Sequence, residues 1–90
     1  MDYKNIIEEL LKGIGGRENI SAHASCMTRL KISVKNIERV DMSQLEKVEG
    51  VLGIKENGNQ FQFIFGPGKV KKAYNELDKV IKDKSTADKA

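Results

Sequence analysis

The chain contains one cysteine, Cys26, and it stands just ahead of a hydroxyl and a guanidinium, those of Thr28 and Arg29. A thiol attacks as its thiolate, and a neighbouring guanidinium stabilises that anion. Backbone N–H groups of a turn at Met27 and Thr28, the Thr28 hydroxyl and Arg29 would together present several donors to a tetrahedral anion. These residues predict a nucleophilic cysteine beside a phosphate-binding turn.

Other uses of Cys26 have to be weighed against this one. A single cysteine in a small domain is most often a buried, unreactive apolar side chain. A lone cysteine cannot close an internal disulfide, which fits a reducing compartment. A cysteine phosphatase is excluded, because its phosphate loop places an arginine six residues after the cysteine and this chain has Ile32 there.

The composition predicts one small soluble domain. The chain has 90 residues and a net charge of +3, and no apolar run is long enough to span a bilayer. The amino terminus is charged, unlike a signal peptide. Lysines gather in residues 69–90, which permits an acidic partner without indicating nucleic acid. No metal ligands or cofactor-binding residues are expected.

The first half of the chain predicts a helix and two strands. Apolar residues recur at helical spacing from Ile6 to Ile14, Asp2 can cap this helix, and the following glycines end it. A short strand is expected around Ile20. In residues 29–35 aliphatic and cationic side chains alternate, so a strand there would point them to opposite faces.

The second half predicts a helix, a hairpin and a last helix. Ser43 begins a Ser-x-x-Glu capping box, and Asn57-Gly58 between two β-prone runs favours a type I′ hairpin turn. Pro67 suits the first turn of a helix that continues to Ile81. Residues 1–82 are expected to form the domain, and the polar residues 83–90 a tail or the start of an interdomain linker.

The expected fold class is therefore α+β, an αββαββα sandwich. A four-stranded antiparallel sheet would carry three helices on one face and leave the opposite face open. If the aliphatic residues of 29–35 face the helices, Arg29 and Lys31 lie on the open face near Cys26.

Two separated blocks resemble a known family. The stretch "NISAHASCMTRLKISVKN" is similar to the phosphorylation-site signature of the IIB domains of bacterial sugar phosphotransferase systems, glucose/sucrose type. It has an Asn-Ile pair seven residues before Cys, then Cys-x-Thr-Arg and alternating aliphatics. The stretch "VEGVLGIKENGNQFQFIFGPGKV" resembles the second half of that family, with Gly-Val-x-Gly and Gly-x-Gln-x-Gln.

The resemblance implies a phosphocarrier enzyme, a sugar phosphotransferase. Cys26 would accept a phosphoryl group from a phosphohistidine on a IIA domain and pass it to a sugar held by a membrane-embedded IIC domain. Met27, Thr28 and Arg29 would bind the phosphate, and Arg29 would stabilise its charge. The domain would work at the cytoplasmic face of the bacterial membrane, with no nucleic acid as partner and no cofactor.

Two positions depart from the family pattern, and one alternative function stays open. Lys31 replaces a second arginine of the family. This keeps the positive charge but loses the planar fork of donors, so Lys31 is expected to be an auxiliary residue without a bidentate contact. His23 stands three residues before Cys26, where relatives often have histidine adjacent, and a surface position is expected for it. The alternative is a small basic nucleic-acid-binding domain whose alternating phenylalanines Phe61, Phe63 and Phe65 stack on bases, although core packing is the better interpretation.

Overall fold

The structure, a computed structural model, describes residues 2–89, with the side chains of residues 2–82. The described residues form three α-helices, four strands and two short 3-10 helices. In chain order these are α1 (Tyr3–Ile14), η1 (Arg17–Asn19), β1 (Ile20–Cys26), β2 (Arg29–Val34), η2 (Ile37–Arg39), α2 (Met42–Glu46), β3 (Gly53–Asn57), β4 (Gln60–Ile64) and α3 (Lys69–Lys89).

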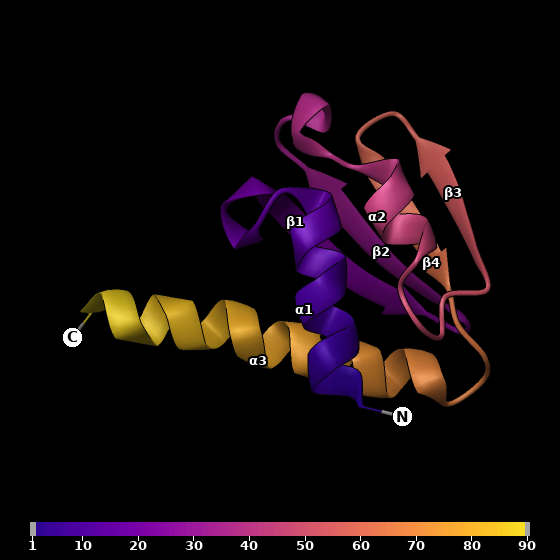
Figure 1. The fold of residues 1–90 in the computed structure, drawn as a ribbon. Helices are drawn as coiled ribbons and strands as arrows, with labels where there is room; N and C mark the ends of the chain where they lie inside the picture. The colour runs from indigo at the N-terminus through magenta and orange to yellow at the C-terminus, as the bar shows by residue number, and fades with distance from the viewer. Residues whose placement is uncertain (1, 90) are drawn as a thin grey trace.

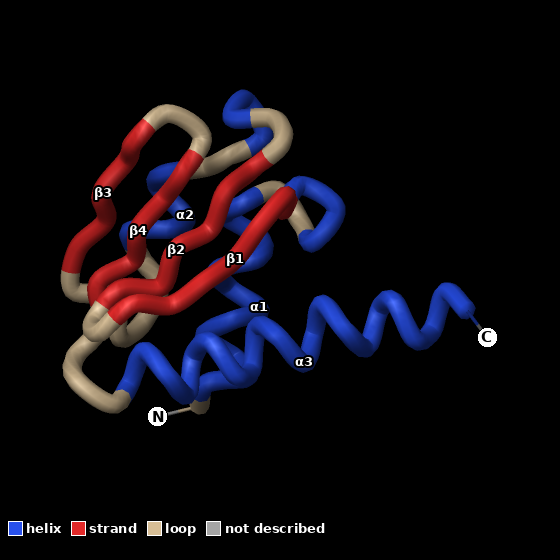
Figure 2. The backbone as a smooth tube through the Cα atoms, turned by 180° about the vertical axis from the view of Figure 1, so that it is seen from behind, coloured by secondary structure: helices blue, strands red, loops and turns tan. Residues whose placement is uncertain are grey.

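The strands form one antiparallel sheet in the order β1-β2-β4-β3. Two hairpins, β1–β2 and β3–β4, meet along the β2–β4 pairing at the centre. This topology confirms the expected α+β sandwich. The helices lie on one side of the sheet, as Figure 1 shows, and the view from behind shows the strands with no helix in front of them (Figure 2).

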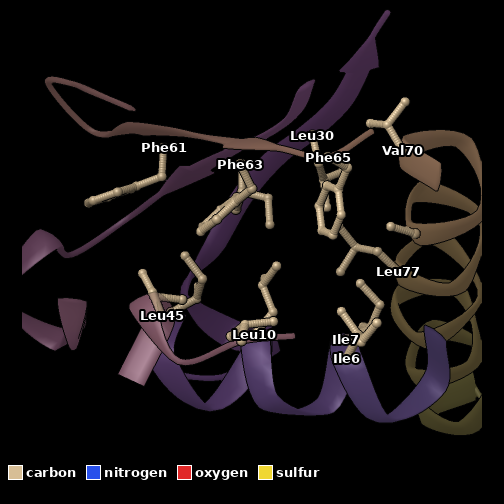
Figure 3. Close-up of a cluster of buried hydrophobic side chains, with 14 of the residues drawn as sticks. Ile6, Ile7, Leu10, Leu30, Leu45, Phe61, Phe63, Phe65, Val70 and Leu77 are labelled. Carbon is tan, nitrogen blue, oxygen red and sulfur yellow. The ribbon is translucent and has the colours of Figure 1, made fainter. Parts of the chain in front are cut away.

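The core lies between the sheet and the helices. On β2 the aliphatic residues are buried and alternate with half-exposed polar ones, as the sequence predicts. Phe61, Phe63 and Phe65 are each at most 1% exposed, and Figure 3 shows them on the sheet side of the core, facing residues of α1 and α2 such as Leu10 and Leu45. Because the three rings are buried, they cannot stack on bases, and the nucleic-acid alternative loses the feature on which it depended.

The first helix is capped at both ends as expected. The Asp2 carboxylate accepts from the N–H of Asn5, and Gly15 adopts a left-handed φ of 103° while its N–H donates to the Leu11 carbonyl. Such a conformation favours glycine, since other residues would place Cβ against the backbone. After Gly15 the chain leaves the axis of α1, so that the following strand can join the sheet.

The second helix begins earlier than the sequence predicts, and the expected capping box at Ser43 is wrong. Asp41 is the N-cap, because its carboxylate accepts from the N–H of Gln44, and Ser43 already lies inside the helix. Asp and Ser are comparable capping residues, so local sequence does not separate them. Gln44 also donates to Glu9 of α1 at 2.8 Å, which fixes where the short helix can start.

The β3–β4 hairpin is confirmed, but its loop is shifted by one residue from the expected Asn57-Gly58. Asn57 pairs with Gln60, which leaves Gly58 and Asn59 as the loop. Of the two, Gly58 alone has a positive φ, 61°. A type I′ turn needs positive φ at both central residues, whereas a type II′ turn needs it only at the first. The expected I′ turn is therefore wrong.

The last helix begins after Pro67 instead of including it. Pro67 and Gly68 form a turn, closed by the N–H of Lys69 donating to the Gly66 carbonyl at 3.1 Å. Gly68 has a φ of 81°, which interrupts the helical path, so α3 starts at Lys69. The expected tail, residues 83–90, falls where side chains are not described, and the domain boundary at residue 82 stays a prediction.

Candidate functional site

Cys26 is the last residue of β1 and is exposed, as expected for a thiol that must meet a partner. It pairs with Arg29, the first residue of β2, across the two-residue turn Met27-Thr28. Met27 has a φ of 52°, the one positive φ among the described non-glycine residues, and its side chain is 87% exposed. Backbone strain of this kind often occurs where a turn presents its N–H groups to a ligand.

Both ends of the β1–β2 hairpin are held by hydrogen bonds to residues outside the hairpin. At the cysteine end, the Thr28 carbonyl accepts from the N–H of Phe65 at 2.8 Å. At the other end, Asn19 is 1% exposed and its amide donates to the carbonyls of Ile14 and Asn36. Because both ends are fixed, the turn is held at the end of the sheet.

A shallow depression of about 390 Å³ lies at this end of the sheet. It is lined by Cys26, Met27, Thr28, Arg29, Lys31 and Gln62. The structure thus brings together all the residues that the sequence places at the site, including the auxiliary Lys31. Such a depression has room for a phosphoryl group and stays accessible to a partner.

Cross-strand pairs show which side chains share the open face of the sheet. Directly opposed residues of antiparallel strands point to the same side. One row is Cys26, Arg29, Ile64 and Gly53, and the next is Ala24, Lys31, Gln62 and Lys55. Among the described strand residues, the open face therefore has three cations and no carboxylate, which favours an anionic ligand.

Arg29 is held by a chain of two hydrogen bonds across the open face. Its Nη1 donates to Gln62 Oε1 at 2.8 Å, and Gln62 Nε2 donates to Gln60 Oε1 at 3.0 Å. All three residues are partly buried. The guanidinium thus lies against β4 at the edge of the depression that Cys26 lines.

His23 lies on the other side of β1 from Cys26. Its Cα partner is Ile32, which is buried under the helices, whereas Cys26 is three residues further and points to the open face. His23 Nε2 donates to Asp78 Oδ1 at 3.0 Å, and its ring contacts that of Tyr74. It is half-buried against α3 and not on the surface as expected, and it is not placed to assist Cys26.

The sequence analysis missed Gln60 and Gln62 as site residues, although it noted their motif. A signal was present, because both alternate with buried phenylalanines and so point to the open face. What local sequence does not show is that Gln62 pairs with Lys31 of β2 and so lies beside Arg29. Arg29 and Gln62 are 33 residues apart in the sequence, and the register of β2 with β4 brings them together.

The described residues contain no group of three or more histidine, cysteine, aspartate or glutamate side chains that could hold a metal ion. No helix among them is both long and apolar enough to cross a membrane.

The structure is an α+β sandwich with an exposed cysteine on a hairpin that also carries Arg29 and Lys31, and comparisons with known proteins identify the family to which it belongs. A family model described as "phosphotransferase system, EIIB" matches residues 8–41. A crystal structure of one domain of a phosphotransferase-system IIabc component from Clostridium difficile is 40% identical, with a TM-score of 0.79, and the match covers 86% of this chain and 80% of that one. The chain belongs to the EIIB family of the phosphotransferase system.

Curated relatives are longer proteins of the same system. The chain is 38% identical over 84 residues to the N-acetylmuramic acid-specific EIIBC component of Vibrio parahaemolyticus. It is 42% and 39% identical to the sucrose-specific EIIBC components of Pasteurella multocida and Bacillus subtilis, over 81 and 79 residues. These matches cover 93%, 90% and 88% of this chain but only 17% of the length of each relative.

Proposed function

We propose that this chain is a phosphocarrier domain of a sugar phosphotransferase. Cys26 accepts a phosphoryl group from the phosphohistidine of a IIA domain and passes it to a sugar held by a IIC membrane domain. The single observation that supports this most is the position of Cys26, exposed at the end of β1 and beside a cation-lined depression. Family membership supports the same assignment.

The proposed reaction has two displacements at phosphorus. In the first, the Cys26 thiolate attacks, a sulfur–phosphorus bond forms, and the nitrogen–phosphorus bond of the phosphohistidine breaks. In the second, a sugar hydroxyl attacks, an oxygen–phosphorus bond forms, and Cys26 leaves as a thiolate while the hydroxyl proton passes to a base. Catalysis of such transfers depends on positioning and on stabilising charge on the phosphoryl oxygens.

The turn and its cations supply that stabilisation in the proposal. N–H groups of the Met27-Thr28 turn and the Thr28 hydroxyl hold phosphoryl oxygens, and Arg29 stabilises their charge. Lys31 is auxiliary, since an ammonium on the next row supplies charge without a fixed fork. An exposed thiol suits two successive partners, because both must reach the same sulfur atom.

The partners and location follow from the relatives only as proposals. Relatives named EIIBC join the B part to a C part, so we place this domain at the cytoplasmic face of the membrane beside its IIC domain. Relatives of nearly equal identity are named for sucrose and for N-acetylmuramic acid. Similarity in this part of the protein therefore does not determine the sugar.

The test is direct phosphorylation. The domain is incubated with phosphoenolpyruvate, the general phosphotransferase proteins and a cognate IIA, and intact mass is measured. We expect one added phosphoryl group on Cys26, and none in Cys26→Ser. Phosphate on His23, or no phosphate on any residue, would overturn the proposal.

A further inference from the structure

We propose that Gln62, supported by a hydrogen bond to Gln60, is a positioning residue that holds the Arg29 guanidinium beside Cys26 without neutralising its charge. This inference rests on the proposed phosphocarrier function and assigns a role to residues outside the turn. The observation behind it is the hydrogen-bond chain from Arg29 to Gln62 to Gln60.

The direction of each hydrogen bond in this chain is determined by chemistry. A guanidinium has donors only, so the Gln62 atom that faces Arg29 must be the carbonyl oxygen. The amide nitrogen of Gln62 then faces Gln60, which can satisfy it only with its own oxygen. Arg29 therefore selects the orientation of the Gln62 amide, and the bond to Gln60 stabilises the selected orientation.

Arginine needs such a partner because its side chain is long. A free arginine on a sheet surface samples many rotamers, and fixing it for each transfer costs conformational entropy. One hydrogen bond at 2.8 Å ties Nη1 to β4. A guanidinium has five N–H donors, so this single bond leaves the others for phosphoryl oxygens.

The acceptor is neutral, which separates holding Arg29 from cancelling its charge. A glutamate at position 62 would hold the guanidinium at least as firmly, since ion-paired hydrogen bonds are stronger than neutral ones. Its negative charge would also oppose an incoming phosphoryl group. The absence of carboxylates among the open-face strand positions agrees with this requirement.

Three variants separate these effects. Gln62→Leu removes the acceptor and should lower the rate constant of phosphoryl transfer to Cys26 on the order of 10-fold to 100-fold, because a misplaced group loses its effect. Gln62→Glu should also lower the rate, although Arg29 stays held. Gln60→Met removes only the hydrogen bond that supports Gln62 and should cause a smaller loss. Ser33→Ala, on the row of Gln60, is the matched control and should equal the wild type.

The decisive readouts distinguish positioning from a merely structural role. Rates are measured against the concentration of phosphorylated IIA, and a positioning role lowers kcat with little change in KM. Thermal unfolding of each variant establishes that it is folded. The double variant Arg29→Lys, Gln62→Leu should be little slower than Arg29→Lys alone, since residues that act through one another are not additive.

Each outcome decides between the claims. Wild-type kcat in both Gln62 variants would overturn the inference. So would a loss of rate from Gln62→Leu that is as large in the Arg29→Lys background as in the wild type. A rate in Gln62→Glu equal to the wild type would show that neutrality is not required and would overturn that part. If the wild-type domain itself accepts no phosphoryl group on Cys26, the proposed function fails, which is a separate result.

Discussion

Cys26 and Arg29 are cross-strand partners at the closed end of the β1–β2 hairpin, and both face the open side of the sheet. The strand register brings the thiol and the guanidinium to one surface with two residues of turn between them. The two groups also line the same depression. Any partner that reaches the sulfur must therefore approach the guanidinium as well, so donor and acceptor of a phosphoryl group would use the same surface in turn.

Exposure of Cys26 predicts rapid alkylation of the native protein. With the side chain exposed at a strand end, iodoacetamide should modify it at nearly the rate measured in urea. Intact mass over time, in native buffer and in denaturant, gives both rates. Protection of the thiol until the protein unfolds would mean that Cys26 is structural, and Cys26→Ser provides the unreactive control.

Gly13 of α1 lies at a close contact with α2. A Cβ at this position would lie 2.5 and 2.7 Å from Cδ2 and Cγ of Leu45, and Leu45 is fully buried. Gly13→Ala should therefore destabilise the protein by about 1 to 3 kcal/mol, since overpacking outweighs the gain in helix propensity. The melting temperature measures this loss.

Gly53→Ala is the matched control for that measurement. A Cβ at Gly53 meets only Ile64 Cδ1, at an ordinary 3.6 Å. We expect little change in its melting temperature. If Gly13→Ala were as stable as Gly53→Ala, the contact between the two helices would not be as close as the structure describes.

The hydrogen bond between Asp78 on α3 and His23 on β1 should be sensitive to acid. The hydrogen bond from His23, then the one from Lys82, hold the pKa of the Asp78 carboxyl below its usual value of 3.8. Because this pKa is lowered on folding, the carboxylate contributes stability above its unfolded pKa, and that contribution is lost as the pH falls through the folded pKa. The ring contact of His23 with Tyr74 does not depend on this charge.

Asp78→Asn should therefore lower the free energy of unfolding at pH 6 and have a smaller effect in strong acid. Urea unfolding at a series of pH values measures both. Glu8→Gln, an exposed acid on α1, is the control and should change stability less. A difference between Asp78→Asn and the wild type that stays constant down to the acid limit would contradict the assignment.

Alternation within single strands was enough to predict which residues face the core. Leu30, Ile32 and Val34 are buried as expected, and Cys26 and Arg29 lie on the open face. One error arose because two nearby residues, Asp41 and Ser43, are comparable as N-caps of a helix. Tertiary partners decide such cases, and here Gln44 of α2 is bonded to Glu9 of α1.

Contacts between strands were less accessible to sequence reasoning. The one-residue shift of the β3–β4 loop moves the pairing of the two strands by two residues, so Ile54 and the phenylalanines share the core face in either register, and alternation does not distinguish the two loops. The bond between Arg29 and Gln62 depends in turn on the β2–β4 register. Cys26 and its turn could therefore be predicted as a site, whereas the support of Arg29 by β4 could not.

Arg29 offers the sharpest test of how the site treats charge. If Arg29 acts only as a positive charge, Arg29→Lys should cause a mild loss of transfer, because the ammonium keeps that charge. If it acts through a planar pair of donors, the loss should be severe, since lysine has no fixed fork. We expect severe loss, about 100-fold or more in rate, the usual cost of one oriented donor at an anion-stabilising site.

The measurement separates the transfer from IIA to Cys26 and the transfer from Cys26 to sugar. Lys31→Ala is the comparison, because Lys31 is adjacent on the open face and already lacks a fork, so its loss should cost less than that of Arg29. The bond from Arg29 Nη1 to Gln62 also requires a guanidinium that reaches β4, and lysine has a single terminal nitrogen to divide between Gln62 and phosphate. Wild-type rates of Arg29→Lys in both steps would falsify the role assigned to the guanidinium.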